Sequence, residues 1–151
     1  MIQIQKYSVA EPMSIEAQEN VVDFLFKSLE EYGDPKNDIN KCINYAMNTL
    51  YDNKETNGMV LSATINDKIV GAVILNETGM GGYIPENILV YIATDPNYRG
   101  QGIGKNLMRE AIASVTGDIA LHVEPDNPAK KLYESLGFTN KYLEMRFKQT
   151  K

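Results

Sequence analysis

The spacing of apolar side chains changes repeatedly along this chain, and each change predicts a new element of secondary structure. Apolar residues recur at helical spacing in some segments and alternate with polar residues, or form short unbroken runs, in others. This order predicts a single α/β domain spanning residues 1–151, with a mixed sheet of about six to seven strands and helices on both faces. We expect helices over residues 22–32, 39–50, 102–115 and 127–137, and strands over residues 2–6, 59–65, 68–75, 88–94, 119–124 and 142–148.

Turn-forming residues separate these segments. Gly33 follows the first helical stretch and predicts its end, and the Asp34-Pro35 pair that comes next is typical of the cap and first turn of a second helix. Asn66 and Asp67 stand between two apolar runs, which predicts a tight hairpin. The sequence contains no repeat or low-complexity segment that would divide the predicted domain.

Composition excludes several classes of protein. The 151 residues include one Cys and one His, so an internal disulfide is ruled out and a tetrahedral zinc site lacks ligands. No apolar run reaches the ~18–20 residues of a membrane span. Residues 1–11 lack the pattern of a signal peptide, so we expect a cytoplasmic protein without a membrane partner. The net charge of −5 argues against nucleic acid as a partner.

The charge is unevenly divided along the chain. Residues 1–98 carry 6 Lys against 14 acidic residues, whereas residues 99–151 carry 9 Lys and Arg against 6 acidic residues. Such a division suits two ligands of opposite charge, a cation near the first part and an anion near the second. Such a division of charge also arises by chance, so the sequence motifs must distinguish between these two explanations.

The most informative motif is a glycine-rich segment between a predicted strand and a predicted helix. Gly100, Gly102 and Gly104 leave backbone N–H groups uncovered at the start of the helix, where the helix dipole adds positive charge. Arg99 and Lys105 flank these glycines with full charges. The predicted ligand of this segment is a phosphate or pyrophosphate group. The spacing fits neither a Walker A loop nor the dinucleotide-binding fingerprint, because single residues separate the glycines and no Ser or Thr follows the lysine.

Two motifs together resemble those of the GNAT superfamily of N-acetyltransferases. The first, Arg99-x-x-Gly102-x-Gly104 after a strand, is similar to the acetyl-coenzyme A motif of that superfamily. The second runs from Asn127 to Phe138 and is similar to the motif that follows, an Asn-capped helix that carries a Tyr and ends in Gly-Phe. The resemblance implies a GNAT fold over the whole chain, acetyl-CoA as co-substrate without a metal, and acetyl transfer to a primary amine.

The resemblance also implies where the co-substrate lies. The backbone of residues 92–94 would pair with the pantetheine arm like an added strand, and the backbone N–H groups of residues 99–105 would hold the pyrophosphate. Asn127 and Lys130 would lie along the arm or near the adenosine phosphate, although Lys130 is equally consistent with a solvated helix face. The implied cofactor-binding residues are Ile92, Ala93, Thr94, Arg99, Gly100, Gln101, Gly102, Ile103, Gly104, Lys105, Asn127, Lys130 and Tyr133.

Acetyl transfer needs an acid for the departing thiolate and a base for the amine. Tyr133 is the candidate acid, since a phenol can protonate or hydrogen-bond a thiolate and family members commonly carry a Tyr there; its alternative is an aromatic core residue. His122 and Glu124 are two residues apart and so share one face of a predicted strand, and they are the candidate bases. Glu86 or water are the other candidates. Backbone N–H groups of the strand before the glycine-rich segment are the expected partners of the oxyanion.

Segments 15–52 and 76–87 are expected to frame the acceptor. Their acidic residues, among them Glu30 and Asp34, favour a cationic amine of a small molecule or peptide, although exposed acids also simply keep a surface soluble. Cys42 falls on an apolar helical stripe and is expected to be a buried residue rather than a nucleophile. This favours direct attack in a ternary complex over an acetyl-Cys intermediate.

Two other functions fit parts of the pattern. A non-catalytic sensor that binds coenzyme A would keep the glycine-rich segment but lack a working acid and base. A protein-interaction module would bind no coenzyme A at all. The candidate acid and base favour the enzyme, and the pattern leaves a homodimer open.

Overall fold

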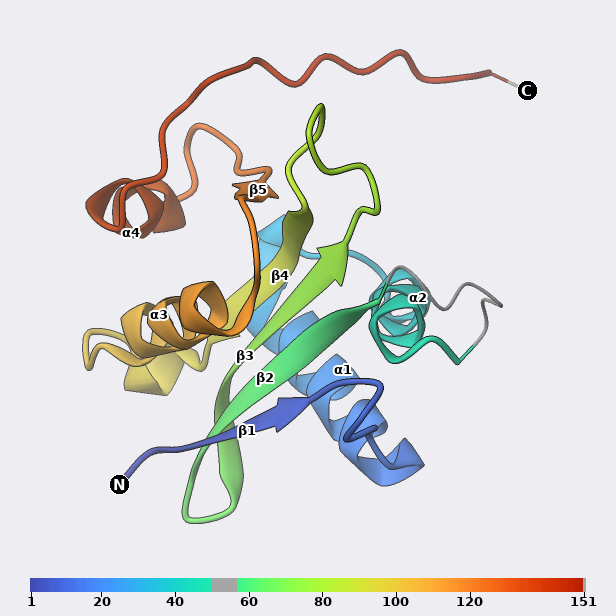
Figure 1. Cartoon of the computed structure of the whole chain (residues 1–151). Coiled ribbons are helices and arrows are strands. Elements are labelled where there is room, and N and C mark those ends of the chain that lie inside the picture. The colour runs from blue at the N-terminus through green and yellow to red at the C-terminus, as the bar shows by residue number, and fades with distance from the viewer. Residues whose placement is uncertain (50–56, 151) are drawn as a thin grey trace. The chain divides into compact units, whose positions relative to one another are not determined.

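The computed structural model describes residues 1–49 and 57–150, whose strands form one five-stranded sheet (Figure 1). The strands follow chain order across the sheet. Neighbouring strands are antiparallel except for the last pair, which is parallel, so the sheet is mixed as predicted. The strands are β1 (Gln3–Tyr7), β2 (Gly58–Ile65), β3 (Lys68–Glu77), β4 (Asn87–Thr94) and β5 (Ile119–Leu121).

Helices pack on both faces of the sheet, which confirms the predicted α/β architecture. Two helices lie on one face and a third lies on the other (Figure 1). The chain forms two compact units: the first, Met1–Leu121, contains the sheet and these three helices, and the second, His122–Lys151, contains a fourth helix. The helices are α1 (Ile15–Leu29), α2 (Lys36–Met47), α3 (Ile103–Ser114) and α4 (Ala129–Ser135), with short 3₁₀ turns η1 (Glu30–Tyr32) and η2 (Pro96–Tyr98).

The main core lies between the sheet and the pair formed by α1 and α2. Both helices are amphipathic, so each turns one apolar stripe to the sheet and a polar face to water. Burying a single Leu or Ile side chain contributes about 1.5–3 kcal/mol, so this stripe-to-sheet contact holds the two helices in place. The buried residues of this core include Val21, Val22, Leu25, Ile39, Ile43, Ala46, Val60, Ala72, Ile74, Tyr91 and Ala93.

A glycine on β3 fixes α3 to the opposite face. A Cβ added to Gly71 would lie 2.7 Å from Leu107 Cδ1 and 2.9 Å from Ile103 Cγ2. The absence of a side chain therefore lets α3 approach the sheet closely. Because Ile103 is the first residue of α3, this contact also positions the glycine-rich segment that precedes the helix.

The predicted turns are partly confirmed. Asn66 and Asp67 join β2 to β3 with φ values of 50° and 65°, the left-handed values that a two-residue hairpin turn needs. The cap predicted for the second helix is wrong: Pro35 is the N-cap of α2, and no side-chain bond caps this helix. Asp34 makes a different contact, described below. Leu50, expected at the end of the second helix, lies outside the described residues.

The C-terminal part of the predicted sheet is absent from the described residues. The segment 142–148 forms no strand, and Leu143, Met145 and Phe147 are 81%, 89% and 85% exposed. Alternation of apolar and polar residues suits a strand, but a strand also needs a neighbour for its backbone N–H and C=O groups. β5 ends at Leu121 rather than at residue 124 because it pairs with only three residues of β4. The described sheet therefore has five strands, not six to seven.

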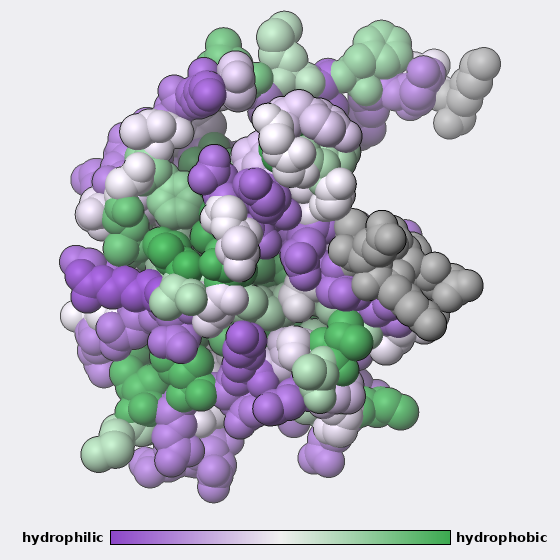
Figure 2. Space-filling view, in the orientation of Figure 1, coloured by the Kyte–Doolittle hydropathy of each residue, from purple (hydrophilic) through white to green (hydrophobic). Residues whose placement is uncertain are grey.

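The surface is mainly hydrophilic, with smaller apolar areas, on the face shown in Figure 2. Among the residues that the structure describes, no helix is both long and apolar enough to span a bilayer.

Candidate active site

One edge of β4 is only partly paired. β4 pairs with β3 along its whole length, from Asn87 to Thr94, but pairs with β5 only as far as Leu89. The register with β3 shifts at the same point, so Val90 is the extra residue of a β-bulge, which bends a strand. From Val90 to Thr94 the described sheet offers this edge no strand partner. An extended ligand can pair with such an edge as an added strand.

A glycine-rich turn leads from this edge, through η2, into α3. Gly100 and Gly102 both have a φ of +80°, which L side chains rarely adopt, and a Cβ added to either would meet no atom within 4 Å. The space beside the turn is therefore open. Gly102 is the N-cap of α3, no side chain caps it, and the first turn contains no acidic residue. The N–H groups of this turn and the helix dipole thus favour an anion.

The two cations that flank the turn are placed differently. Arg99 Nη2 donates to the carbonyl oxygen of Ser28, in the last turn of α1, at 3.5 Å. The Arg99 side chain therefore joins the glycine-rich turn to α1, a role that its position in the motif did not predict. Lys105 lies in the first turn of α3 and is half-buried. Asp95 caps η2 by accepting the N–H of Asn97 at 2.9 Å, which shapes the approach to the turn.

A polar pair lies on the side of β4 that faces α1 and α2. Tyr91 follows the bulge, is 8% exposed, and donates its hydroxyl to Asp34 Oδ2 at 2.6 Å. Asp34 is exposed and belongs to the connection between η1 and α2. Burial, together with the hydrogen bond and charge of Asp34, raises the pKa of Tyr91 far above its ordinary value. The hydroxyl therefore stays a donor, and it ties this connection to β4.

Cys42 is buried on α2, as expected. Its Sγ accepts a hydrogen bond from Asn76 Nδ2 at 3.4 Å. Burial raises the pKa of the Cys42 thiol to about 12, with a smaller opposing effect from Asn76. The group stays a protonated thiol at neutral pH, and a protonated thiol is a poor nucleophile.

In the second unit, the prediction for α4 is partly confirmed: the helix is present, but it covers Ala129–Ser135 and its N-cap is Pro128 rather than Asn127. Asn127 Oδ1 accepts the N–H of Ala129 at 2.9 Å. At the other end Gly137 has a φ of +101°, and the N–H of Phe138 donates to the Tyr133 carbonyl at 3.0 Å. Tyr133 is 7% exposed, its ring centroid lies 6.0 Å from that of Phe138, and burial raises its pKa to about 12. Its hydroxyl is therefore neutral throughout the physiological range.

The candidate bases lie in different surroundings. His122 and Glu124 are exposed and follow the end of β5, so the strand alternation that placed them on one face does not apply. Glu86 Oε1 accepts the N–H of Asp118 at 3.0 Å. The backbone N–H groups of Asp118 and of Glu86 itself lower the pKa of this carboxyl. A carboxylate that is already hydrogen-bonded accepts a further proton less readily, which disfavours Glu86 as the base.

The predicted site residues thus fall into two sets. Residues 92–94 and 99–105 follow one another along the open edge of β4 and the turn after it. The remaining residues belong to the other compact unit, in which Lys130 is half-buried. These are His122, Glu124, Asn127, Lys130 and Tyr133.

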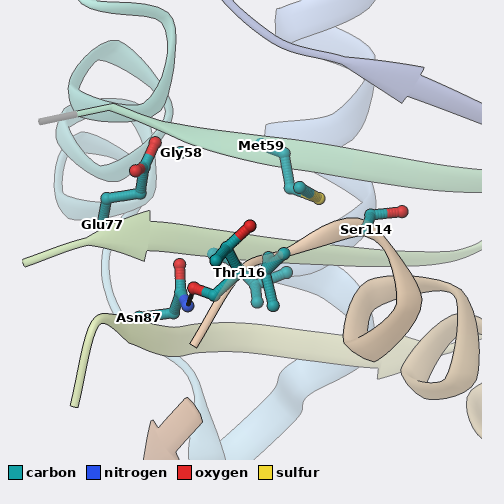
Figure 3. A pocket seen from close by; sticks show the side chains of 8 residues that line it. Gly58, Met59, Glu77, Asn87, Ser114 and Thr116 are labelled. Carbon is teal, nitrogen blue, oxygen red and sulfur yellow. Dashed lines mark hydrogen bonds between the residues drawn. The ribbon is translucent and has the colours of Figure 1, made fainter. Parts of the chain in front are cut away.

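A separate cavity of about 210 Å³ lies at the opposite end of β4 (Figure 3). Asn87 is 3% exposed and donates through Nδ2 to the carbonyl oxygens of Thr116 at 2.9 Å and Asp118 at 3.2 Å, which ties the connection after α3 to the sheet. Asn87 and Thr94 are the two ends of β4, about 23 Å apart in an extended strand. The cavity is therefore distinct from the glycine-rich turn. Its lining consists of Gly58, Met59, Leu75, Glu77, Asn87, Ser114, Val115 and Thr116.

Sequence reasoning missed the two contacts that join distant segments near the site. A Tyr inside an apolar strand signals a hydroxyl that needs a partner, so Tyr91 could have been singled out. Its partner Asp34 is 57 residues earlier, and no local spacing points to it. The same holds for Arg99 and Ser28, which are 71 residues apart.

An open strand edge that leads into a glycine-rich helix N-terminus defines a class of site: it suits an extended ligand with a phosphate group at one end. The model of the acetyltransferase (GNAT) domain family matches residues 56–140 of this chain. The chain belongs to this family, which confirms the resemblance drawn from the two motifs.

Similar proteins are known as sequences and as structures. The chain is 37% identical to human (Homo sapiens) N-alpha-acetyltransferase 30 over 81 residues, which cover 50% of this chain and 22% of that protein. It is 41% identical to N-alpha-acetyltransferase RimI of Mycobacterium tuberculosis over 58 residues, 37% of each chain. The matches therefore span well under half of these relatives. The structure of aminoglycoside N-acetyltransferase AAC(6′)-Iy in complex with CoA superimposes with a TM-score of 0.69 at 16% identity, covering 99% of this chain and 95% of that one, and so shares its fold.

Proposed function

We propose that this chain transfers the acetyl group of acetyl-CoA to a primary amine of a small molecule or peptide, by direct attack in a ternary complex. One observation carries the proposal: the edge of β4 that opens after Leu89 leads through η2 into the glycine-rich turn at the start of α3. Membership of the acetyltransferase family supports acetyl-CoA as the ligand of this continuous surface.

The residues of the first unit fit this co-substrate. The backbone of residues 92–94 would pair with the pantetheine arm, and the N–H groups of residues 99–105 would bind the pyrophosphate. The open space beside Gly100 and Gly102 supports this placement, because side chains at these positions would occupy the volume that the phosphates need. Asn127 and Lys130 are proposed as further contacts to the arm or to the adenosine phosphate.

The transfer moves one acetyl group from sulfur to nitrogen and, in net terms, one proton from nitrogen to sulfur. The amine nitrogen bonds to the acetyl carbon as the carbon–sulfur bond breaks, so the sulfur must gain a proton and the nitrogen must lose one. Tyr133, whose hydroxyl is protonated at neutral pH, is proposed to donate the proton to the sulfur. His122, Glu124 or a water molecule takes the proton from the amine. Backbone N–H groups of β4 would bind the acetyl oxygen.

Direct attack is supported by the state of the only cysteine in the sequence. Cys42 is 8% exposed and its thiol pKa is raised to about 12, so it offers no thiolate to carry the acetyl group. The amine itself is therefore the nucleophile that meets the thioester.

A cationic amine is the proposed acceptor. The 3₁₀ turn η1 and the connection between it and α2 carry the exposed acidic residues Glu30, Glu31 and Asp34. AAC(6′)-Iy, which shares the fold, has been solved with the bisubstrate analogue CoA-S-monomethyl-acetylneamine, which supports a small-molecule amine in this type of site.

Turnover with a panel of amines tests the proposal. The purified chain is mixed with acetyl-CoA and with small amines, diamines or short peptides, and free thiol is followed over time. We expect thiol release that depends on the amine, together with an acetylated product in the mass spectrum. Binding of acetyl-CoA without amine-dependent release would instead identify a coenzyme A sensor, and lack of binding would refute both.

A further inference from the structure

Asp34 is held at the point where the edge of β4 opens. The Tyr91 hydroxyl donates to Asp34 Oδ2 at 2.6 Å. Tyr91 directly follows Val90, the bulge residue beyond which β5 no longer pairs with β4. Tyr91 is buried in the core between the sheet and the first two helices, whereas Asp34 is exposed. One member of the pair is thus anchored in the core, and the other presents a carboxylate to solvent beside the proposed co-substrate edge.

The charge of Asp34 is not balanced by a lysine or arginine in the described ion pairs. Asp23 pairs with Lys36 Nζ at 2.8 Å and Asp95 pairs with Lys68 Nζ at 3.6 Å, but no ion pair among the described residues includes Asp34. Lys36 is only two residues from Asp34 in sequence, yet its ammonium forms an ion pair with Asp23 instead. The hydroxyl that holds Asp34 is neutral, so it orients the carboxylate without cancelling its charge. An oriented carboxylate without a cationic partner attracts a cation from a ligand.

We infer that Asp34, held by Tyr91, is a specificity-determining residue for the acceptor. Its carboxylate binds an ammonium group of the acceptor other than the amine that is acetylated. The favoured substrate class is therefore a primary amine that carries a second positive charge, such as a linear diamine. This inference rests on the proposed acetyl transfer and goes beyond it, because the transfer itself needs only one amine.

The test compares a linear diamine with the monoamine of the same chain length, in the wild type and in Asp34→Asn. We expect Asp34→Asn to raise the diamine KM roughly tenfold, the loss typical of one charged hydrogen bond. The KM for the monoamine and for acetyl-CoA should change less than about twofold, because neither uses this carboxylate. Tyr91→Phe keeps the charge of Asp34 but removes the hydrogen bond that orients its carboxylate. The diamine KM should therefore rise by a smaller factor, roughly threefold.

Asp67→Asn is the matched control. Asp67 is exposed in the turn between β2 and β3, where its φ of 65° also suits Asn, so this substitution removes the same charge elsewhere. The diamine KM should stay within about twofold of the wild type. Equal effects of Asp34→Asn and Asp67→Asn, or equal effects of Asp34→Asn on both amines, would overturn the inference. Thermal melting shows whether each variant is folded, and Asp34→Asn decides the outcome even if Tyr91→Phe does not fold.

A binding measurement separates this inference from the proposed function. The diamine is titrated by calorimetry into the chain saturated with CoA, without turnover. Diamine binding that weakens roughly tenfold in Asp34→Asn supports the role of Asp34 even if no acetylation occurs, in which case the proposed function alone fails. Turnover of both amines with equal KM values in wild type and Asp34→Asn would refute the inference and leave the proposed function standing. Lack of any diamine binding would refute the inference directly.

Discussion

The two sides of the proposed site are built in different ways. Within the first unit, the co-substrate side is one continuous stretch, from β4 through the glycine-rich turn to the first turn of α3, and it offers mainly backbone groups and the positive end of a helix. The acceptor side consists of side chains from separate segments, where Asp34 before α2 meets Tyr91 on β4. The first side depends on backbone geometry, and the second depends on a tertiary contact.

This difference indicates how the two ligands are recognised. Every residue carries a backbone N–H except proline, so a backbone site tolerates many side chains as long as the turn keeps its shape. A side-chain contact changes with each substitution. We therefore expect changes on the co-substrate side to abolish the reaction with every amine, and changes on the acceptor side to alter which amines react.

The largest expected effect is that of Gly102→Glu. The φ of +80° disfavours any side chain at this N-cap, and the new carboxylate would project into the space proposed for the pyrophosphate. Calorimetry should show that acetyl-CoA binds on the order of 100-fold more weakly, because steric and charge effects act together. Gly102→Ala is the control for backbone strain alone and should lose less affinity. Unchanged binding in a folded Gly102→Glu variant would remove the phosphate assignment.

A smaller effect, confined to the chemical step, is expected for Tyr133→Phe. The substitution keeps the buried ring and removes the hydroxyl proposed to protonate the sulfur. Steady-state kinetics should show kcat lowered roughly 10–100-fold for every amine, with the KM for acetyl-CoA nearly unchanged. Tyr142→Phe makes the same change at a residue that is 79% exposed and should keep the wild-type kcat. If the two variants turn over equally fast, Tyr133 is not the acid.

The same contrast explains how much of the structure was predictable from sequence. Apolar periodicity predicted the helices of the first unit because each of them buries one apolar stripe against the sheet, as α1 and α2 show. It failed for 142–148, where the pattern of a strand is present but no partner strand pairs with it in the described sheet. Strand pairing is a property of two segments, and the spacing within one of them does not contain it.

The glycine-rich turn on the proposed co-substrate side was predictable for a related reason. The glycines, the strand before them and the helix after them are neighbours in sequence, so their spacing alone indicated an anion site. The Tyr91–Asp34 and Arg99–Ser28 contacts join segments 57 and 71 residues apart, and only the packing of α1 and α2 on the sheet brings them together. The general base is a similar case, because β5 ends before His122 and the strand geometry expected to place His122 and Glu124 on one face is absent.

The smallest expected effect on the reaction is that of Cys42→Ala, because Cys42 belongs to neither the co-substrate side nor the acceptor side of the proposed site. We expect acetyl transfer within about twofold of the wild type with every amine, because a buried protonated thiol takes no part in direct attack.

The stability of the Cys42→Ala variant should change instead. Burial raises the thiol pKa from 9.0 to about 12, so in the pH range between these values the unfolded chain loses this proton while the folded chain keeps it. The contribution of this shift to stability is complete below pH 9 and is lost as the pH rises toward 12. Urea unfolding at pH 8 and about pH 10.5 should therefore show a steeper alkaline loss of stability in the wild type than in Cys42→Ala. A folded Cys42→Ala variant without acetyl transfer would contradict direct attack and would place a covalent step on α2.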